Sequence, residues 1–216
     1  METFQEVLDF IEPEQVGRYW FSGQSITPQS RIFGGQVLAQ CLMAANKTVP
    51  EAMTAHSMHA YFLRAGDSTA PIEFEVDPIR DGRSFATRRV VARQHNQAIF
   101  NTSISYQVHE DGMRHTDRMP DVSALAFKHE PELTSEGKLR YPLLERYGVE
   151  RMRADDPAGS AMKVGQNNWY RGKGTLVNEP RVHQAALVLI SDFSLLSTAL
   201  RAHKEIDWWR DFMFAS

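Results

Sequence analysis

The sequence predicts an α+β fold in which a long helix is wrapped by an antiparallel sheet. Residues 34–49 have helical spacing with apolar side chains on most faces, as a buried central helix requires. A short helix at 4–11 and a strand at 18–24 precede it. Four later segments have the alternating, β-branched pattern of half-buried strands: 56–64, 72–79, 84–95 and 98–108.

The pattern divides the chain into three parts. Residues 1–110 form the first domain. Residues 111–165 are polar, charged and interrupted by prolines, which predicts a linker that crosses the surface. Residues 166–216 begin a second domain of similar layout, with a strand followed by an apolar helix. Because this last part is about half as long as the first domain, we expect its sheet to be incomplete in this chain.

Composition excludes several classes of protein. A content of 42% hydrophobic residues in 216 suits an ordinary globular core, and a net charge of −3 argues against a nucleic-acid binder. The lone Cys41 excludes an internal disulfide. The N-terminus lacks a secretory signal, and no apolar run is long enough to span a membrane. We therefore predict a cytoplasmic protein without nucleic-acid or membrane partners.

The apolar segment 183–200 contains a single carboxylate, Asp192, in its middle. A helix that is apolar on nearly every side is expected to be buried, and burying an ionised carboxylate costs several kcal/mol unless partners hold it. From the residues alone, an Asp in a helix is more often salt-bridged than catalytic. Asp192 therefore has two interpretations at this point, a structural ion pair or a functional acid.

Four strings taken in order carry a resemblance to a known family: RIFGGQVLAQ from Arg31, HSMHAYFLRAGD from His56, RDGRSFATRRVVARQ from Arg80 and RVHQAALVLISDFSLL from Arg181. Together they resemble the acyl-CoA thioesterase II family, the TesB-like double-hotdog enzymes, from about residue 4 to the last residue. The resemblance implies tandem hotdog folds, with the second incomplete here. It also implies hydrolysis of fatty acyl-CoA to free fatty acid and CoA, no cofactor, and a homo-oligomer.

The resemblance also implies site residues. The family uses an aspartate on the second hotdog helix, a Thr or Ser at the start of the next strand and a later glutamine, which together orient a water molecule. Asp192 matches the aspartate and Ser216 the hydroxyl residue, whereas the glutamine has no counterpart within the 216 residues. His56 takes in the first domain the place that Ser216 takes in the second, which makes it a secondary candidate.

Thioester hydrolysis needs an acceptor for the proton of water and donors for the developing oxyanion. We expect Asp192 to be the acceptor, with Ser216 orienting the water. The free N–H groups at helix starts make Gly34, Gly35 and the turn around His183 candidate donors to the carbonyl oxygen. Arg88, with its basic neighbours, is a candidate for binding the 3′-phosphate of CoA.

Other interpretations stay open. In an alternative mechanism, Asp192 acts as a nucleophile and forms a mixed anhydride with the acyl group. In an alternative function, the chain is a non-catalytic acyl-CoA-binding or assembly fragment. A hydratase fits poorly because His183 lies nine residues before Asp192. Metal binding is not expected, since His56 and His59 face opposite sides of a strand. The sequence leaves the acyl-chain length, the oligomer number and the pathway undetermined.

Overall fold

The computed structural model describes residues 1–26, 31–117, 128–129, 143–152, 165–193 and 195. These residues form two compact units. The larger unit comprises residues 5–111 and 176–192, and the smaller unit comprises the remaining described residues.

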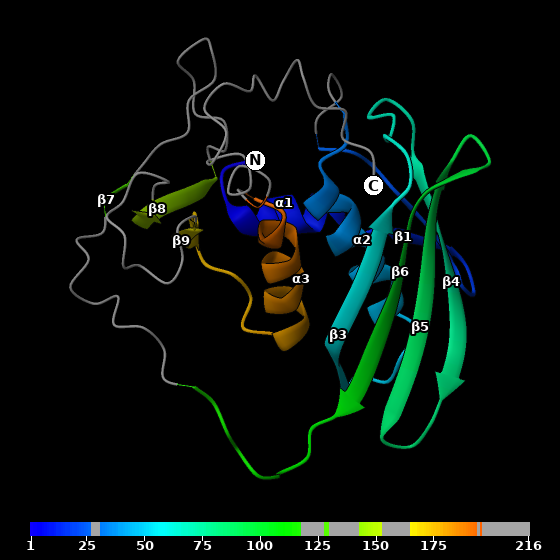
Figure 1. The fold of residues 1–216 in the computed structure, drawn as a ribbon. Coiled ribbons are helices and arrows are strands. Elements are labelled where there is room, and N and C mark those ends of the chain that lie inside the picture. The colour runs from blue at the N-terminus through cyan, green and yellow to red at the C-terminus, as the bar shows by residue number, and fades with distance from the viewer. Residues whose placement is uncertain (27–30, 118–127, 130–142, 153–164, 194, 196–216) are drawn as a thin grey trace. The chain divides into compact units, whose positions relative to one another are not determined.

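The larger unit contains a six-stranded sheet with the order β1-β2-β4-β5-β6-β3, in which all neighbouring strands are antiparallel (Figure 1). Its strands are β1 (Glu14–Gly17), β2 (Trp20–Gly23), β3 (Met53–Phe62), β4 (Ile72–Asp81), β5 (Phe85–Gln94) and β6 (Gln97–Val108). The four long strands confirm the segments predicted from alternation. The β5–β6 hairpin turns at His95 and Asn96, whose φ angles of 49° and 61° are typical of a tight two-residue turn.

The long helix α2 (Gly34–Asn46) packs against one face of this sheet (Figure 1). Alternate residues of β5 point into the core, among them Ala86, Val90 and Ala92. They pack with Cys41 and Leu42 of α2, which are fully buried. The predicted central helix over 34–49 is therefore confirmed. The shorter helix α1 (Phe4–Ile11) also matches its predicted bounds.

The helix α3 (Pro180–Ser191) packs beside α2 in the larger unit. Arg181 of α3 links this helix to α2 and β3. Its guanidinium donates to the backbone oxygens of Asn46 in α2 at 2.9 Å and Met53 in β3 at 3.0 Å. Asn46 is the last residue of α2, so its carbonyl lacks an intrahelical donor and a cation there is stabilising. Within the described residues, no helix is long and apolar enough to cross a membrane.

The smaller unit contains a three-stranded antiparallel sheet formed by β7 (Lys128–His129), β8 (Leu144–Met152) and β9 (Gly165–Gly172). The strand β9 lies where the sequence predicted one. The strand β8, however, lies inside the segment 111–165, so the prediction of a linker alone was wrong. A register shift between Gly148 and Glu150 interrupts the period-two pattern of β8, which explains why alternation did not reveal it.

Candidate active site

Asp192 lies directly after α3, as its C-cap residue, and faces the first turn of α2. Its Oδ2 accepts a hydrogen bond of 3.0 Å from the backbone N–H of Gly35. A carboxylate at the C-terminus of its own helix is unfavourably placed, whereas the N-terminus of α2 carries partial positive charge and stabilises it. The prediction that Asp192 lies in the middle of a helix over 183–200 was wrong, because the apolar sequence contains no Gly or Pro to mark where α3 ends.

Gly34 and Gly35 are needed because two helices and a carboxylate meet there. A Cβ atom on Gly35 would lie 2.2 Å from the backbone oxygen of Leu189, which is far too close. A Cβ atom on Gly34 would lie 2.7 Å from both Asp192 Oδ2 and Phe62 Cε1. Glycine at these two positions lets the start of α2 approach the end of α3, and this approach sets the position of the Asp192 carboxylate.

The N–H groups of the first turn of α2 have different partners. Gln36 and Val37 both donate to the backbone oxygen of Phe33. The N–H of Gly35 is occupied by Asp192, so it holds the carboxylate and is not available to an oxyanion. In the part of the chain that the structure describes, no acceptor receives the N–H of Gly34. Gly34 therefore keeps the donor role that the sequence assigned jointly to the two glycines.

Burial changes the acidity of Asp192. Desolvation raises the pKa of its carboxyl above the ordinary value of 3.8, and the hydrogen bond from Gly35 acts in the opposite direction by stabilising the anion. The carboxylate is thus a better proton acceptor than an exposed aspartate. A half-buried carboxylate with a shifted pKa on a cavity wall is typical of functional sites.

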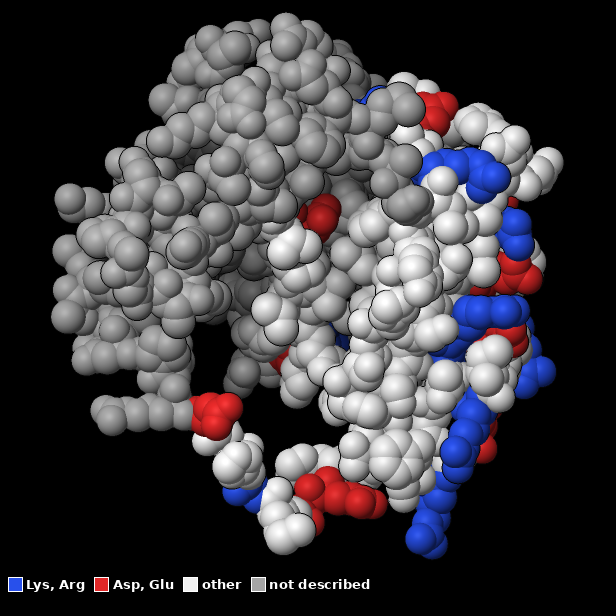
Figure 2. All heavy atoms as spheres, viewed as in Figure 1, with Lys and Arg blue, Asp and Glu red and all other residues white. Residues whose placement is uncertain are grey.

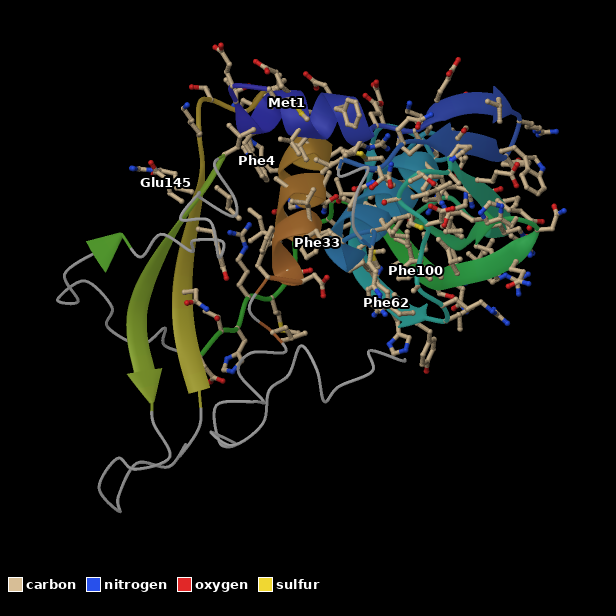
Figure 3. All side chains as sticks on the ribbon, turned by 90° about the horizontal axis from the view of Figure 1, so that it is seen from above. Met1, Phe4, Phe33, Phe62, Phe100 and Glu145 are labelled. Atoms are coloured by element: carbon tan, nitrogen blue, oxygen red, sulfur yellow. The ribbon has the colours of Figure 1, made fainter. Side chains whose placement is uncertain are left out.

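Asp192 lines a cavity of about 520 Å³ in the larger unit. Apolar side chains make up most of its wall: Ile32, Phe33, Val37, Phe62, Leu63, Ile99 and Phe100. Figure 3 labels Phe62 and Phe100 close together, and Phe33 at the start of α2. The rings of Phe62 and Phe100 meet edge to face, with centroids 5.0 Å apart. The site therefore combines a carboxylate with a space suited to a hydrocarbon chain.

Arg88 does not have the role that the sequence suggested. Its side chain is only 2% exposed because it shares the core face of β5 with Val90. Its five N–H groups are matched by five acceptors: Thr48 Oγ1 and O, Arg80 O, Thr87 O and Asp81 Oδ1. No donor is left for a phosphate, so Arg88 stabilises the fold. The strand alternation around it was the signal that identified the buried face.

Two further sequence-predicted residues, His56 and His183, are not brought to Asp192. His56 is exposed on β3, with Nε2 2.9 Å from Ser105 Oγ, and it does not line the cavity. The N–H of His183 donates to Glu179 O in the first turn of α3, so it is neither free nor near the Asp192 end of that helix. Ser216 lies outside the described residues. In the described ranges, no three His, Cys, Asp or Glu side chains gather as a metal site requires.

Family models match both parts of the chain. The model of the acyl-CoA thioesterase N-terminal domain matches residues 23–107, and that of acyl-CoA thioesterase matches residues 144–216. The chain is also 33% identical to acyl-CoA thioesterase 2 of Haemophilus influenzae over 215 residues, which cover 94% of this chain and 75% of that relative. The chain belongs to the acyl-CoA thioesterase family. The second family match begins at the first residue of β8, inside the segment predicted as a linker.

Solved structures agree with this family membership. The acyl-CoA thioesterase II TesB2 from Mycobacterium marinum is 32% identical, with a TM-score of 0.73 over 92% of this chain and 71% of that one. A hotdog-fold protein from Alicyclobacillus acidocaldarius, 19% identical, has a TM-score of 0.64 over 86% of this chain and 68% of that one, which supports the fold alone. The predicted α+β hotdog class is confirmed, and membership of the family makes the protein a thioester hydrolase.

Proposed function

We propose that this protein hydrolyses fatty acyl-CoA to a free fatty acid and CoA, and thereby takes part in fatty acid metabolism. The observation that carries the proposal is the Asp192 carboxylate, held at the N-terminus of α2 on the wall of an apolar cavity. Transfer of each CH₂ group from water to such a wall contributes about 0.8 kcal/mol, which favours an acyl chain over a polar acyl group.

Asp192 accepts a proton from water as the water oxygen attacks the thioester carbonyl carbon. The negative charge that develops on the carbonyl oxygen needs a donor, and we assign this role to the N–H of Gly34, a residue that lines the cavity. Collapse of the tetrahedral intermediate breaks the C–S bond, and the CoA sulfur leaves as the thiol by taking from Asp192 the proton that Asp192 accepted from water. We assign Ser216 to orientation of the water on the family resemblance alone.

The burial of Asp192 fits this role. A carboxylate in bulk water is a weak base, whereas partial desolvation raises the pKa of Asp192 and strengthens it as a proton acceptor. The N–H of Gly35 keeps the carboxylate oriented, and no donor among the described residues occupies its other oxygen, Oδ1, which we assign to the water.

The test is release of CoA thiol from acyl-CoA thioesters that differ only in chain length. We expect hydrolysis of dodecanoyl-CoA with a lower KM than that of acetyl-CoA, because the longer chain buries more apolar surface in the cavity. Tight binding of a dodecyl-CoA thioether without turnover of dodecanoyl-CoA would instead favour the alternative of an acyl-CoA-binding protein. Equal KM values for the two thioesters would contradict the assignment of the cavity to the acyl chain.

We also propose that the protein forms a homo-oligomer and is cytoplasmic. An edge strand presents unpaired N–H and C=O groups that can pair with a second copy, and β3 is an edge strand of the described six-stranded sheet. Light scattering of the purified protein measures the mass in solution. A mass equal to the 24.6 kDa of one chain at micromolar concentration would contradict the oligomer.

A further inference from the structure

Two arginines, Arg31 and Arg64, interrupt the apolar lining of the cavity. They lie on two loops that the structure holds together. Arg31, before α2, forms an isolated antiparallel bridge with Asp67, in the loop after β3. Gly66 in that loop packs so closely that an added Cβ atom would lie 2.6 Å from the Ile32 side chain. The two positive charges therefore border the same cavity as Asp192.

Arg64 is anchored and yet available. Its backbone N–H donates to Ile99 O at 3.1 Å, and its Nη1 donates to Ala98 O at 2.7 Å, while the side chain is exposed. A guanidinium carries five N–H groups, so most of its donors are not used by this bond. Within the described residues, Arg64 has no carboxylate partner.

Two arginines of β5 are neutralised by carboxylates of the neighbouring strand β4. Arg89 pairs with Asp77 at 2.8 Å and Arg93 with Glu75 at 3.2 Å, both across neighbouring strands. Figure 2 shows basic and acidic side chains beside one another at the edge where β4 and β5 lie in Figure 1. Asp67, the acid of the loop next to Arg64, accepts hydrogen bonds from Thr69 and His95. Arg64 thus differs from these arginines in two ways. It borders the cavity, and no carboxylate among the described residues neutralises its charge.

We propose that Arg64, with Arg31 beside it, binds a phosphate group of the CoA moiety while the acyl chain lies against the apolar wall. The inference rests on the proposed function and replaces Arg88 as the phosphate-binding residue. A planar guanidinium with free N–H groups recognises phosphate in a bidentate manner, and the bond is strong because both partners are charged. The substrate has the matching arrangement of a hydrocarbon chain joined to an anionic carrier.

The test measures binding, by calorimetry, of two non-hydrolysable ligands, a dodecyl-CoA thioether and the corresponding dodecyl-pantetheine thioether, which lacks all phosphates. We expect R64A to weaken binding of the CoA ligand roughly tenfold while leaving the pantetheine ligand unchanged, as loss of a charge-assisted bond predicts. R64Q, which keeps a donor for Ala98 O but no charge, should behave as R64A does. R83A is the matched control, because Arg83 is an exposed arginine of the β4–β5 turn that does not line the cavity.

A dephospho form of the CoA ligand identifies the phosphate that is bound. Loss of the R64A effect with this ligand assigns the 3′-phosphate, and persistence of the effect assigns the diphosphate, so both outcomes support the proposal. Equal weakening of the CoA and pantetheine ligands, or an R64A effect no larger than that of R83A, would overturn it. Wild-type protein that binds the CoA ligand with this Arg64 dependence but does not hydrolyse dodecanoyl-CoA would refute the proposed hydrolysis and leave the phosphate site standing.

Discussion

Substitution of Gly35 by alanine tests whether the α2–α3 contact positions the Asp192 carboxylate for the proposed reaction. The new Cβ atom would lie 2.2 Å from Leu189 O, whereas ordinary contacts of a Cβ atom begin at 3.4 Å. Because the obstacle is backbone, the two helices have to separate by about 1 Å. The Gly35 N–H to Asp192 Oδ2 distance of 3.0 Å would then exceed hydrogen-bond range.

The expected consequence is a large loss of rate with a moderate loss of stability. A displacement of about 1 Å at a catalytic group costs roughly 100-fold in rate, and overpacking costs about 1–3 kcal/mol of folding free energy. The assays are thiol release from dodecanoyl-CoA and urea unfolding. G112A is the control, because no atom lies within 4 Å of an added Cβ there, and it should leave both quantities unchanged. A G35A variant with wild-type kcat would refute the reasoning.

Three further predictions concern Asp192 and Arg88. Because burial raises the pKa of Asp192, its ionisation destabilises the folded state as the pH rises above the ordinary pKa of 3.8. The variant D192N should therefore have a higher Tm than the wild type at pH 7. This difference in Tm should disappear at pH 3, where the carboxyl is protonated in both the folded and the unfolded state. F62A should admit water beside the carboxylate, lower the pKa of Asp192 and move the acid limb of the kcat/KM profile to lower pH, whereas F62L should not. R88M should lower the free energy of unfolding by about 2–3 kcal/mol in urea without raising the KM for dodecanoyl-CoA, since Arg88 bonds only within the fold. Equal Tm values of D192N and the wild type at pH 7 would contradict the first prediction. An unchanged pH profile of F62A would contradict the second, and a raised KM of R88M would contradict the third.

The first domain was predictable because local patterns specify it. Alternation along β5 and β6 and helical spacing along α2 depend on neighbouring residues only, and each element appears within a few residues of its predicted bounds. The end of α3 was not predictable in this way. The apolar run continues past Ser191, and only the contact with α2 explains why the carboxylate is positioned where it is.

The site was predictable in part. The sequence identified Asp192 and the Gly34–Gly35 pair separately, but the bond between Asp192 and Gly35 joins residues 157 positions apart, which no local pattern reveals. Arg64 was missed for a similar reason, because its place at the cavity depends on the packing of its loop against Ile32. Arg88 was misassigned because a row of basic residues looks exposed until strand alternation separates its two faces.

The central claim is that the Asp192 carboxylate takes the proton of the attacking water. The most direct measurement is kcat for dodecanoyl-CoA hydrolysis by D192N, compared with D77N, the same chemical change at an ion-paired aspartate that does not line the cavity. We predict a loss of at least about 100-fold for D192N, as expected for removal of a positioned proton acceptor, and a wild-type rate for D77N. A D192N variant that is folded and hydrolyses dodecanoyl-CoA at the rate of D77N would contradict the claim.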